Sequence, residues 1–364
     1  MHLYVHIPFC HRICPYCSFY KHTPGNTDMR GFIDALIAEA RQRAPQLLAP
    51  VTTLYLGGGT PSMLSRSHLS RLFDGLHSAL DLRSLGEVTL EANPATFDAA
   101  KAQHFLTLGV NRVSLGIQSF APHVLQTLGR EHSREEAMTS VQVLRDAGMP
   151  AINIDLMFSI PGQSADDWQE TIQTAASLAP DHISAYNLTY EEDTEFLDRL
   201  TRGEYREDIE RNASDFLTAE RILTAAGFDH YETSNYAKPG FASVHNQGYW
   251  RGHDYLGLGP SAVSTLNSVR HRNLADTPGY ITMINHVGHA ATEVEELDAE
   301  ARRIERLALL LRTREGAPLT LLDAAGRDRL QILVEELLVT VDGERLRLIG
   351  RGPLLVDEIA AHLV

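Results

Sequence analysis

The sequence predicts an α/β protein in which an incomplete (β/α)6 barrel precedes a smaller α+β domain. Six short apolar runs alternate with helical patterns over the first half of the chain, and repeated strand–helix–strand units form parallel sheets. This repeat breaks near residue 237, and after residue 297 two helical patterns precede a hairpin and a closing helix. We therefore expect a partial barrel over 1–236, a connecting segment over the barrel at 237–296 and a winged-helix-like domain over 297–364.

The expected strands are the apolar runs Leu3–Ile7, Thr53–Leu56, Glu87–Glu91, Arg112–Ile117, Ala151–Met157 and His182–Asn187. Helical patterns lie between them at Asp28–Ala44, Ser65–Leu80, Ser133–Ala147 and Ser164–Leu178. Gly148 suits a helix C-cap, and Ser164 suits an N-cap because its hydroxyl can accept from a first-turn amide. In such sheets ligands bind at the carboxyl ends of the strands.

Composition narrows the class of function. The chain has 364 residues, of which 43% are hydrophobic, and 32 Lys and Arg against 47 Asp and Glu give a net charge of −15. An acidic chain without a basic run is a poor binder of nucleic-acid phosphates, so we expect no nucleic-acid partner. No apolar run is long enough for a membrane span and the N-terminus lacks a signal-peptide pattern. We expect a cytoplasmic protein.

All three cysteines, Cys10, Cys14 and Cys17, lie within eight residues. Structural zinc would need a fourth ligand from His6, His11 or His22. A thioredoxin-like pair would use Cys14 and Cys17 and leave the remaining cysteine idle. Three buried structural cysteines would have no reason to cluster. The spacing Cys-x3-Cys-x2-Cys also suits three corners of a [4Fe–4S] cluster with one iron left open.

Polar and glycine residues follow the other expected strands. "GGGTP" ends the second strand, Glu91 the third and Gln118 the fourth, while Asp155 lies in the fifth. Taken singly, the glycines suit a tight turn and the polar side chains suit caps or loop contacts. Because parallel strands end at one edge, we expect these residues to share a rim with the cysteine loop.

These motifs resemble the radical S-adenosylmethionine superfamily. Tyr16 before the last cysteine fits that pattern, and "YVHIPFC", "GGGTPS", "EANP", "SLGIQSF", "LGREHS", "DLMFSIPGQ" and "ISAYNLTYEE" resemble the group of oxygen-independent coproporphyrinogen III oxidases and HemW-type haem chaperones. The resemblance runs from Tyr4 to the C-terminus.

The resemblance implies that the three cysteines hold a [4Fe–4S] cluster whose open iron binds S-adenosylmethionine. It places Gly58, Gly59 and Thr60 beside the cofactor, because glycines allow close backbone approach. Further positions that the resemblance assigns to the cofactor are Glu91, Gln118, Arg130 and Asp155. Tyr4 and Tyr16 are expected to pack around the nucleoside and the cluster. A surface ion pair is the alternative for Arg130.

Two differences favour the chaperone group. The oxidases have a fourth cysteine where this chain has Phe19, and a longer segment before the first strand, whereas Tyr4 is near the start here. "HNQGYW", His245 to Trp250, resembles the HNxxYW signature of HemW-type proteins, which is associated with haem. Histidine is a common haem ligand and aromatic rings suit a porphyrin plane.

The resemblance therefore implies a haem site at His245, Asn246, Tyr249 and Trp250, with His253 and His271 as rival ligands. The alternative is a loop that packs on the barrel mouth, with Trp250 in the core. Val263 replaces the histidine that the family usually has in "GPGAHS", which weakens the haem assignment at that position.

The function expected from this resemblance is haem binding and delivery to acceptor proteins such as respiratory enzymes, membrane-associated ones included. The competing function is a radical enzyme that acts on a porphyrinogen, and we assign no catalytic residue. A winged-helix-like end alone suggests DNA, but the charge speaks against it. The sequence leaves the oligomeric state open, with a homodimer among the alternatives.

Overall fold

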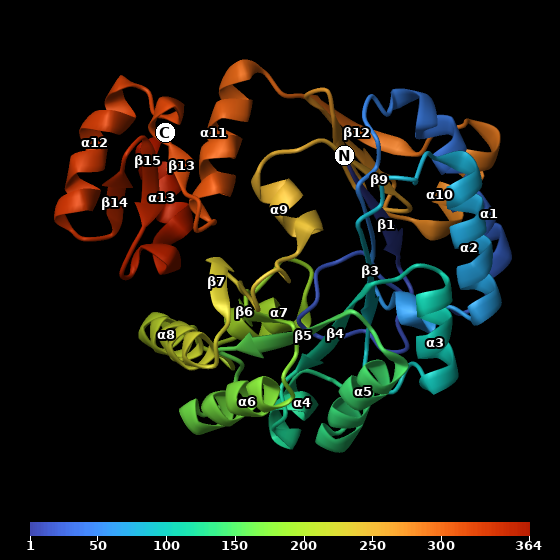
Figure 1. Ribbon diagram of the computed structural model, residues 1–364, viewed down its shortest axis with the longest axis horizontal. Helices are drawn as coiled ribbons and strands as arrows, with labels where there is room; N and C mark the ends of the chain where they lie inside the picture. The colour runs from blue at the N-terminus through green and yellow to red at the C-terminus, as the bar shows by residue number, and fades with distance from the viewer.

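The computed structural model describes residues 1–364. Its first six strands are those expected from the sequence, and they pair in parallel in chain order. Figure 1 shows them as one curved sheet, as in an open barrel. The strands are β1 (His2–Ile7), β2 (Thr53–Gly58), β3 (Glu87–Ala92), β4 (Arg112–Gln118), β5 (Ala151–Phe158) and β6 (His182–Asn187).

Helices cover the outer face of these strands (Figure 1). Serine capping boxes start two of them, at Ser133 and Ser164, and Gly148 ends the first of the two with φ = 81°. The helices of this part are α1 (Met29–Arg43), α2 (Arg66–Ala79), α3 (Ala99–Thr107), α4 (Pro122–Thr127), α5 (Arg134–Ala147), α6 (Ala165–Ser177), α7 (Glu195–Thr201) and α8 (Ile209–Ala225). Of these, α7 lies beside the cysteine loop, where the Phe196 amide donates to the Pro15 carbonyl.

The two faces of the sheet differ in polarity. Strand side chains alternate between faces, and the helix-covered face holds apolar residues such as Leu3, Val5 and Leu54, all 0% exposed. The alternate positions hold polar or aromatic residues, such as Tyr4 and Thr53. Parallel sheets usually bury apolar side chains on both faces. A polar inner face therefore leaves room for ligands in place of a second core.

The segment 237–296 extends the sheet at the free edge of β1. β9 pairs in parallel with β1, and three antiparallel strands follow, while β7 and β8 extend the β6 edge. Pairing there satisfies edge amides and carbonyls that would otherwise stay open. These elements are β7 (Asp229–Glu232), β8 (Asn235–Ala237), α9 (Val244–Trp250), β9 (Tyr255–Leu258), β10 (Val263–Leu266), β11 (Val269–Asn273), α10 (Thr277–His286) and β12 (Ala291–Glu296).

This extension belongs to the barrel's own core. Leu258, Tyr280 and Ile284 are part of one apolar cluster of 54 buried residues that begins at Leu3. The segment that we expected to lie over the barrel therefore widens its sheet, and α9 lies on the inner side of the curved sheet (Figure 1).

The C-terminal domain has a separate core of 13 buried residues from Leu307 to Leu363. Helices and a three-stranded sheet in the order β13-β15-β14 give the winged-helix-like arrangement expected from the sequence. It lies beside the barrel, with α11 nearest α9 (Figure 1). No helix in the structure is both long and apolar enough to cross a membrane. The elements are α11 (Ala299–Leu311), β13 (Ala317–Pro318), α12 (Ala324–Glu335), β14 (Val339–Asp342), β15 (Arg345–Leu348) and α13 (Val356–Leu363).

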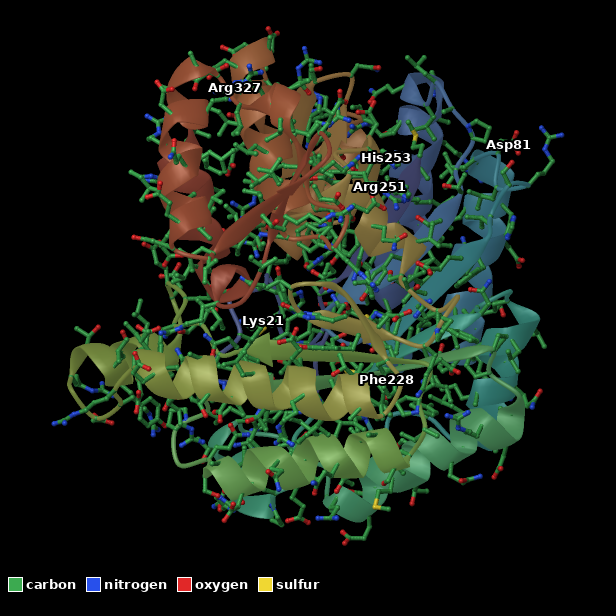
Figure 2. The ribbon with its side chains drawn as sticks, turned by 60° about the vertical axis from the view of Figure 1, so that its left-hand side comes forward. Lys21, Asp81, Phe228, Arg251, His253 and Arg327 are labelled. Atoms are coloured by element: carbon green, nitrogen blue, oxygen red, sulfur yellow. The ribbon has the colours of Figure 1, made fainter.

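Side chains near α9 join the barrel to this domain. Arg251 forms an ion pair with Glu315, and the Arg312 guanidinium lies 5.9 Å from the centre of the Trp250 ring. Figure 2 shows Arg251 and His253 between the two parts of the molecule, whereas Arg327 lies on the outer side of the C-terminal domain. The position of α9 is thus tied to that of the C-terminal domain.

Candidate functional site

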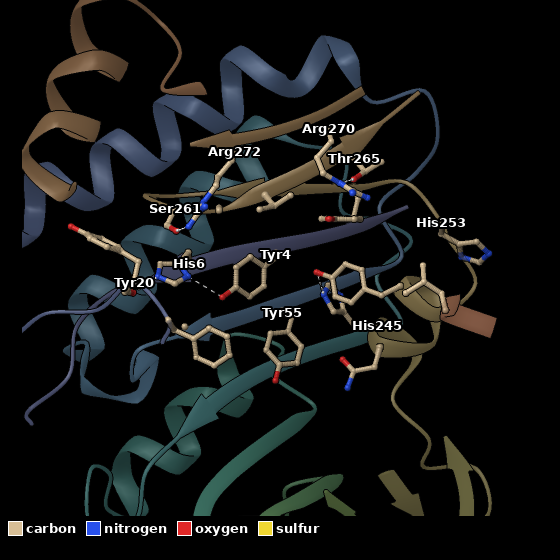
Figure 3. Close-up of a pocket in the computed structure, with 18 of the residues that line it drawn as sticks. Tyr4, His6, Tyr20, Tyr55, His245, His253, Ser261, Thr265, Arg270 and Arg272 are labelled. Carbon is tan, nitrogen blue, oxygen red and sulfur yellow. Dashed lines mark hydrogen bonds between the residues drawn. The ribbon is translucent and has the colours of Figure 1, made fainter. Parts of the chain in front are cut away.

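Two adjoining cavities open on the polar face of the sheet. The rim cavity, of about 410 Å³, lies at the carboxyl ends of the strands and includes all three cysteines. The tyrosine cavity, of about 620 Å³, lies between the sheet, α9, β10–β11 and α11 (Figure 3). The two cavities share four lining residues, which are Phe19, Tyr55, Gly58 and Glu91.

The cysteines lie in the loop after β1. The amide of Cys10 donates to the His22 carbonyl over 3.0 Å, and that of Cys17 to the Cys14 carbonyl over 3.2 Å, which closes the loop into a compact turn. No group of three or more His, Cys, Asp or Glu side chains in the structure is arranged to hold a single metal ion. Three thiols around one cavity fit a larger cluster of several irons.

Hydrogen-bond donors surround the cysteine sulfurs. The Thr60 hydroxyl lies 3.6 Å from the Sγ of Cys10, and an Arg130 guanidinium nitrogen lies 3.7 Å from the Sγ of Cys14. Burial raises the pKa of the Cys10 thiol, and the Thr60 hydroxyl opposes that shift. Donors to the sulfur favour the thiolate form that metal ligation needs, and they tune a bound metal.

The glycine patch lets β2 approach the cysteine loop. Gly58 has φ = 107°, and a Cβ there would lie 2.5 Å from the His6 ring. A Cβ at Gly59 would lie 2.7 Å from the carbonyl oxygen of Phe9. The patch amides already donate within the chain, Gly58 to Glu91 and Gly59 to the carbonyl of Ile7. Glycine is therefore required here for space, and its amides are not free for a ligand.

Two carboxylates line the rim cavity without a lysine or arginine bonded to either. Glu91 accepts from the Tyr55 hydroxyl at 2.8 Å, and Asp155 accepts from Ser114 at 2.8 Å. Burial raises the pKa of Glu91 to about 7, and its repulsion by Asp155 adds to the rise. A cationic ligand would offset the cost of desolvation and the repulsion, because a nearby positive charge favours the charged form of both carboxylates. The cavity thus has the electrostatics for a ligand such as S-adenosylmethionine, which bears an ammonium and a sulfonium.

Arg130 is fixed at the rim by neighbours from two strands. Its guanidinium donates to the Asn93 side-chain oxygen at 2.6 Å and to the Gly116 carbonyl at 2.5 Å. The surface ion pair considered as an alternative is not what the structure has, because the guanidinium contacts an amide oxygen, a carbonyl and the Cys14 sulfur. Gln118 ends β4 with φ = 68° beside a register irregularity. Such backbone strain is frequent at ligand sites.

The two predicted tyrosines separate. Tyr16 lines the rim cavity with the cysteines, whereas Tyr4 lines the tyrosine cavity, where its hydroxyl lies 3.0 Å from Nδ1 of His6. Tyr4 thus lines the cavity next to the one that includes the cysteines, and the roles of both rings beside the nucleoside and cluster stay predictions.

The segment His245–Trp250 forms the helix α9, where we expected a loop. Glu87, inside the barrel, accepts from the first amides of this helix, those of Val244 at 3.0 Å and His245 at 2.9 Å. A carboxylate at a helix N-terminus is favourable because the free amides there are partly positive. This contact anchors α9 in the barrel at the end of the sheet away from the cysteines.

His245 is buried and both of its ring nitrogens have partners. Nδ1 lies 2.7 Å from the Thr53 hydroxyl and Nε2 lies 2.9 Å from the Tyr249 hydroxyl. Burial lowers the pKa of His245 to about 3, so the ring is neutral and acts here as a positioning group for Tyr249.

The other signature residues divide between two environments. Asn246 and Tyr249 line the tyrosine cavity with His245. Trp250 is absent from that lining and packs toward the C-terminal domain, near Arg312. Among the rival histidines, His253 lines the cavity and His271 does not.

Several lining residues were not expected from the sequence. Asn93 bridges Thr60 and Arg130, and its place in "EANP" beside Glu91 was the available signal. Tyr55 forms part of both cavities, and only the polar–apolar alternation of β2 indicated its inward direction. Arg270 and Arg272 line the tyrosine cavity from β11, and their alternate spacing in "VRHRN" was the signal. Val263 also faces this cavity and makes its wall apolar where a histidine would be polar.

Comparison with known proteins gives concordant matches. Residues 4–175 match the family model described as the radical SAM superfamily. The chain is 37% identical over 370 residues to a protein of Mycobacterium tuberculosis named heme chaperone HemW, covering 100% of this chain and 94% of the relative. It is 38% identical over 265 residues to an Escherichia coli protein of the same name, covering 71% and 68%.

A solved structure has the same fold over almost the whole chain. The coproporphyrinogen III oxidase HemN of Escherichia coli, described as a radical SAM enzyme, superposes with a TM-score of 0.86 at 24% identity. The match covers 99% of this chain and 89% of that one. At this identity the likeness shows a shared fold, and both the barrel and the C-terminal domain fall within it.

Proposed function

This chain belongs to the HemW family of haem chaperones within the radical SAM superfamily, and from that premise we propose that it binds haem and delivers it to acceptor haemoproteins. The observation that supports this most is the tyrosine cavity. It is large, mostly apolar and lined by part of the HNxxYW helix, which are the properties expected of a site for one flat cofactor.

The superfamily implies a [4Fe–4S] cluster and S-adenosylmethionine, and the rim cavity fits both. Cys10, Cys14 and Cys17 would hold the cluster, which when bound supplies redox-active iron with one open position. Glu91 and Asp155 would face the cationic groups of S-adenosylmethionine. The other residues assigned to the cofactor are Gly58, Gly59, Thr60, Gln118, Arg130 and Tyr16.

For haem we propose the tyrosine cavity, at His245, Asn246 and Tyr249. Of the three imidazoles that line it, His6 and His245 have partners at both ring nitrogens, whereas His253 has one, His2 at 3.2 Å. His253 thus has a ring nitrogen available for iron. Trp250 would act indirectly, by fixing α9 against the C-terminal domain.

Haem titration of the cluster-reconstituted protein tests this function. We expect a Soret band that saturates at one haem per chain, and transfer of that haem to an apo-haemoprotein on mixing. A spectrum that stays that of free haem at every protein concentration would contradict the proposal.

Three further proposals concern the proteins that accept the haem, the cellular compartment and the oligomeric state. We propose respiratory haemoproteins as acceptors, membrane-associated ones among them, with the cytoplasm as the compartment and self-association as a homodimer. Sedimentation of the apo and haem-bound protein tests the dimer, and pull-down with haem-loaded protein tests the acceptors.

The shared fold with the oxidase HemN keeps an enzymatic alternative under test. Anaerobic incubation with reductant, S-adenosylmethionine and coproporphyrinogen decides between the two. Stoichiometric decarboxylation would favour the enzyme, whereas intact coproporphyrinogen together with haem binding favours the chaperone.

A further inference from the structure

Two arginines line the tyrosine cavity from a single strand. Arg270 and Arg272 alternate along β11, so their side chains leave the same face of the sheet, with Cα atoms about 7 Å apart. Their partners across the hairpin, Thr265 and Val263, also line the cavity. Figure 3 shows both arginines along one side of the cavity, with Tyr4 and Tyr55 across from them.

Both guanidiniums keep donor capacity for a ligand. Arg272 makes only long contacts, 3.7 Å to Glu293 and 3.4 Å to the Ser261 hydroxyl, and its side chain is 47% exposed. Arg270 pairs with Glu305, donates through Nε to the Thr265 hydroxyl at 3.2 Å and lies 4.0 Å from Glu295. A guanidinium has five N–H donors, so neither arginine is saturated, and Arg272 is the freer of the two.

Most of the exposed surface of the remaining lining is apolar, and Glu91, Asn246 and three imidazoles are among its polar members. Tyr4, Tyr55, Tyr249 and Tyr255 present ring faces, and Val263 and Leu309 close the walls. A ligand that fits this cavity is therefore flat and apolar, with two anionic groups along one edge that faces β11. Haem has this form, since its two propionates leave the same edge of the macrocycle.

We propose that Arg272 and Arg270 bind the two propionate carboxylates of haem and so fix the orientation of the macrocycle in the tyrosine cavity. This inference rests on the proposed haem-binding function and adds the groups that recognise the ligand's charge. Guanidinium–carboxylate pairs are often bidentate, which gives direction as well as affinity. The alternative is that the arginines only form ion pairs along the hairpin, which exposed strands commonly do.

The test compares haem with its dimethyl ester, which has the same macrocycle and no carboxylate charge. Both are titrated into the full-length, cluster-reconstituted protein and into Arg272→Gln, Arg270→Gln and the double variant. We expect the dissociation constant for haem to rise about tenfold in Arg272→Gln and up to a hundredfold in the double variant. The constant for the ester should not change.

Two further variants sharpen the test. Arg83→Gln is the matched control, because this arginine also pairs with a carboxylate, Asp81, but lies on the far surface with its side chain 89% exposed. Glu305→Gln removes the acid that competes for Arg270, so it should tighten haem binding a few-fold. A loss of function through misfolding cannot produce that gain.

The outcomes distinguish the proposed binding of the propionates by Arg270 and Arg272, called here the arginine clamp, from haem binding by the protein as a whole. Equal haem constants for the unaltered protein and the double variant, or an equal rise for the ester, overturn the arginine clamp while leaving haem binding intact. Failure of the unaltered protein to bind either compound overturns the proposed function.

Discussion

The rim cavity and the tyrosine cavity share a wall but are assembled from different parts of the sequence. The rim residues follow consecutive strands, so each is a short motif at a position fixed by the parallel sheet. The tyrosine cavity combines strand interiors, as at Tyr4 and Tyr55, with α9, the β10–β11 hairpin and α11. One site is thus dictated by topology, and the other depends on how added segments return to the barrel.

The largest effect expected at either cavity is loss of the cluster. Cys14→Ala should abolish the iron and its absorbance after anaerobic reconstitution, because two thiolates cannot hold three corners of a [4Fe–4S] cluster. Haem affinity should stay within about threefold of the original. His11→Ala is the control, since this exposed histidine, a candidate zinc ligand, should leave iron content unchanged.

Two results for Cys14→Ala would contradict the prediction that the cluster is lost while haem binding is kept. Four irons per chain in Cys14→Ala would remove this cysteine from the ligand set. Complete loss of haem together with the cluster would show that the cavities do not bind independently.

The next effect concerns Glu91, which lines both cavities. Glu91→Gln keeps an oxygen for the Tyr55 hydroxyl but removes the charge, so S-adenosylmethionine should bind about ten- to a hundredfold more weakly in calorimetry. Haem binding should change less, and the exposed Glu192→Gln should behave as the unaltered protein. An unchanged constant for S-adenosylmethionine would exclude a role for this charge.

The same contrast between the two cavities explains which parts of the fold and the sites can be predicted from the sequence. The six strands and the rim at their ends were predictable because period and strand order place each motif. The bonds that fix the rim were not, since Arg130 reaches Asn93 only across strands. His245 was expected to reach a ligand, but Thr53, nearly 200 residues earlier, occupies one of its nitrogens. Such long-range pairs leave no local pattern.

A smaller effect distinguishes the two aromatic residues of α9. Tyr249→Ala removes a ring from the tyrosine cavity and should weaken haem binding about tenfold, measured by Soret titration. Trp250 is the next residue of α9 and lies outside the cavity. Trp250→Ala should therefore change haem affinity by less than about threefold, while lowering the melting temperature. The reverse ranking would show that haem lies between α9 and the C-terminal domain.

The smallest effects are in stability, where the two cavities should respond to pH in opposite directions. In and next to the tyrosine cavity, burial lowers the pKa of His2 and His6 to about 4 and that of His245 to about 3. Below about pH 6.5 these three imidazoles become protonated in the unfolded chain but stay neutral in the folded protein. Stability should therefore fall as the pH drops from about 6.5 toward 4, by up to about 1.4 kcal/mol per unit for each histidine.

In the rim cavity the raised pKa of Glu91, about 7, acts in the opposite sense. Its contribution is complete below the ordinary value of 4.5 and is lost as the pH rises through 7, because a charged carboxylate is then held out of water. Glu91→Gln should raise the melting temperature by a few degrees at pH 8, equivalent to about 1–3 kcal/mol, and leave it unchanged at pH 5. His245→Asn should flatten the acid limb and leave the alkaline one alone. Equal gains for Glu91→Gln at both pH values would mean that folding does not raise the pKa of this carboxyl, which would then be charged at pH 5 as well as at pH 8.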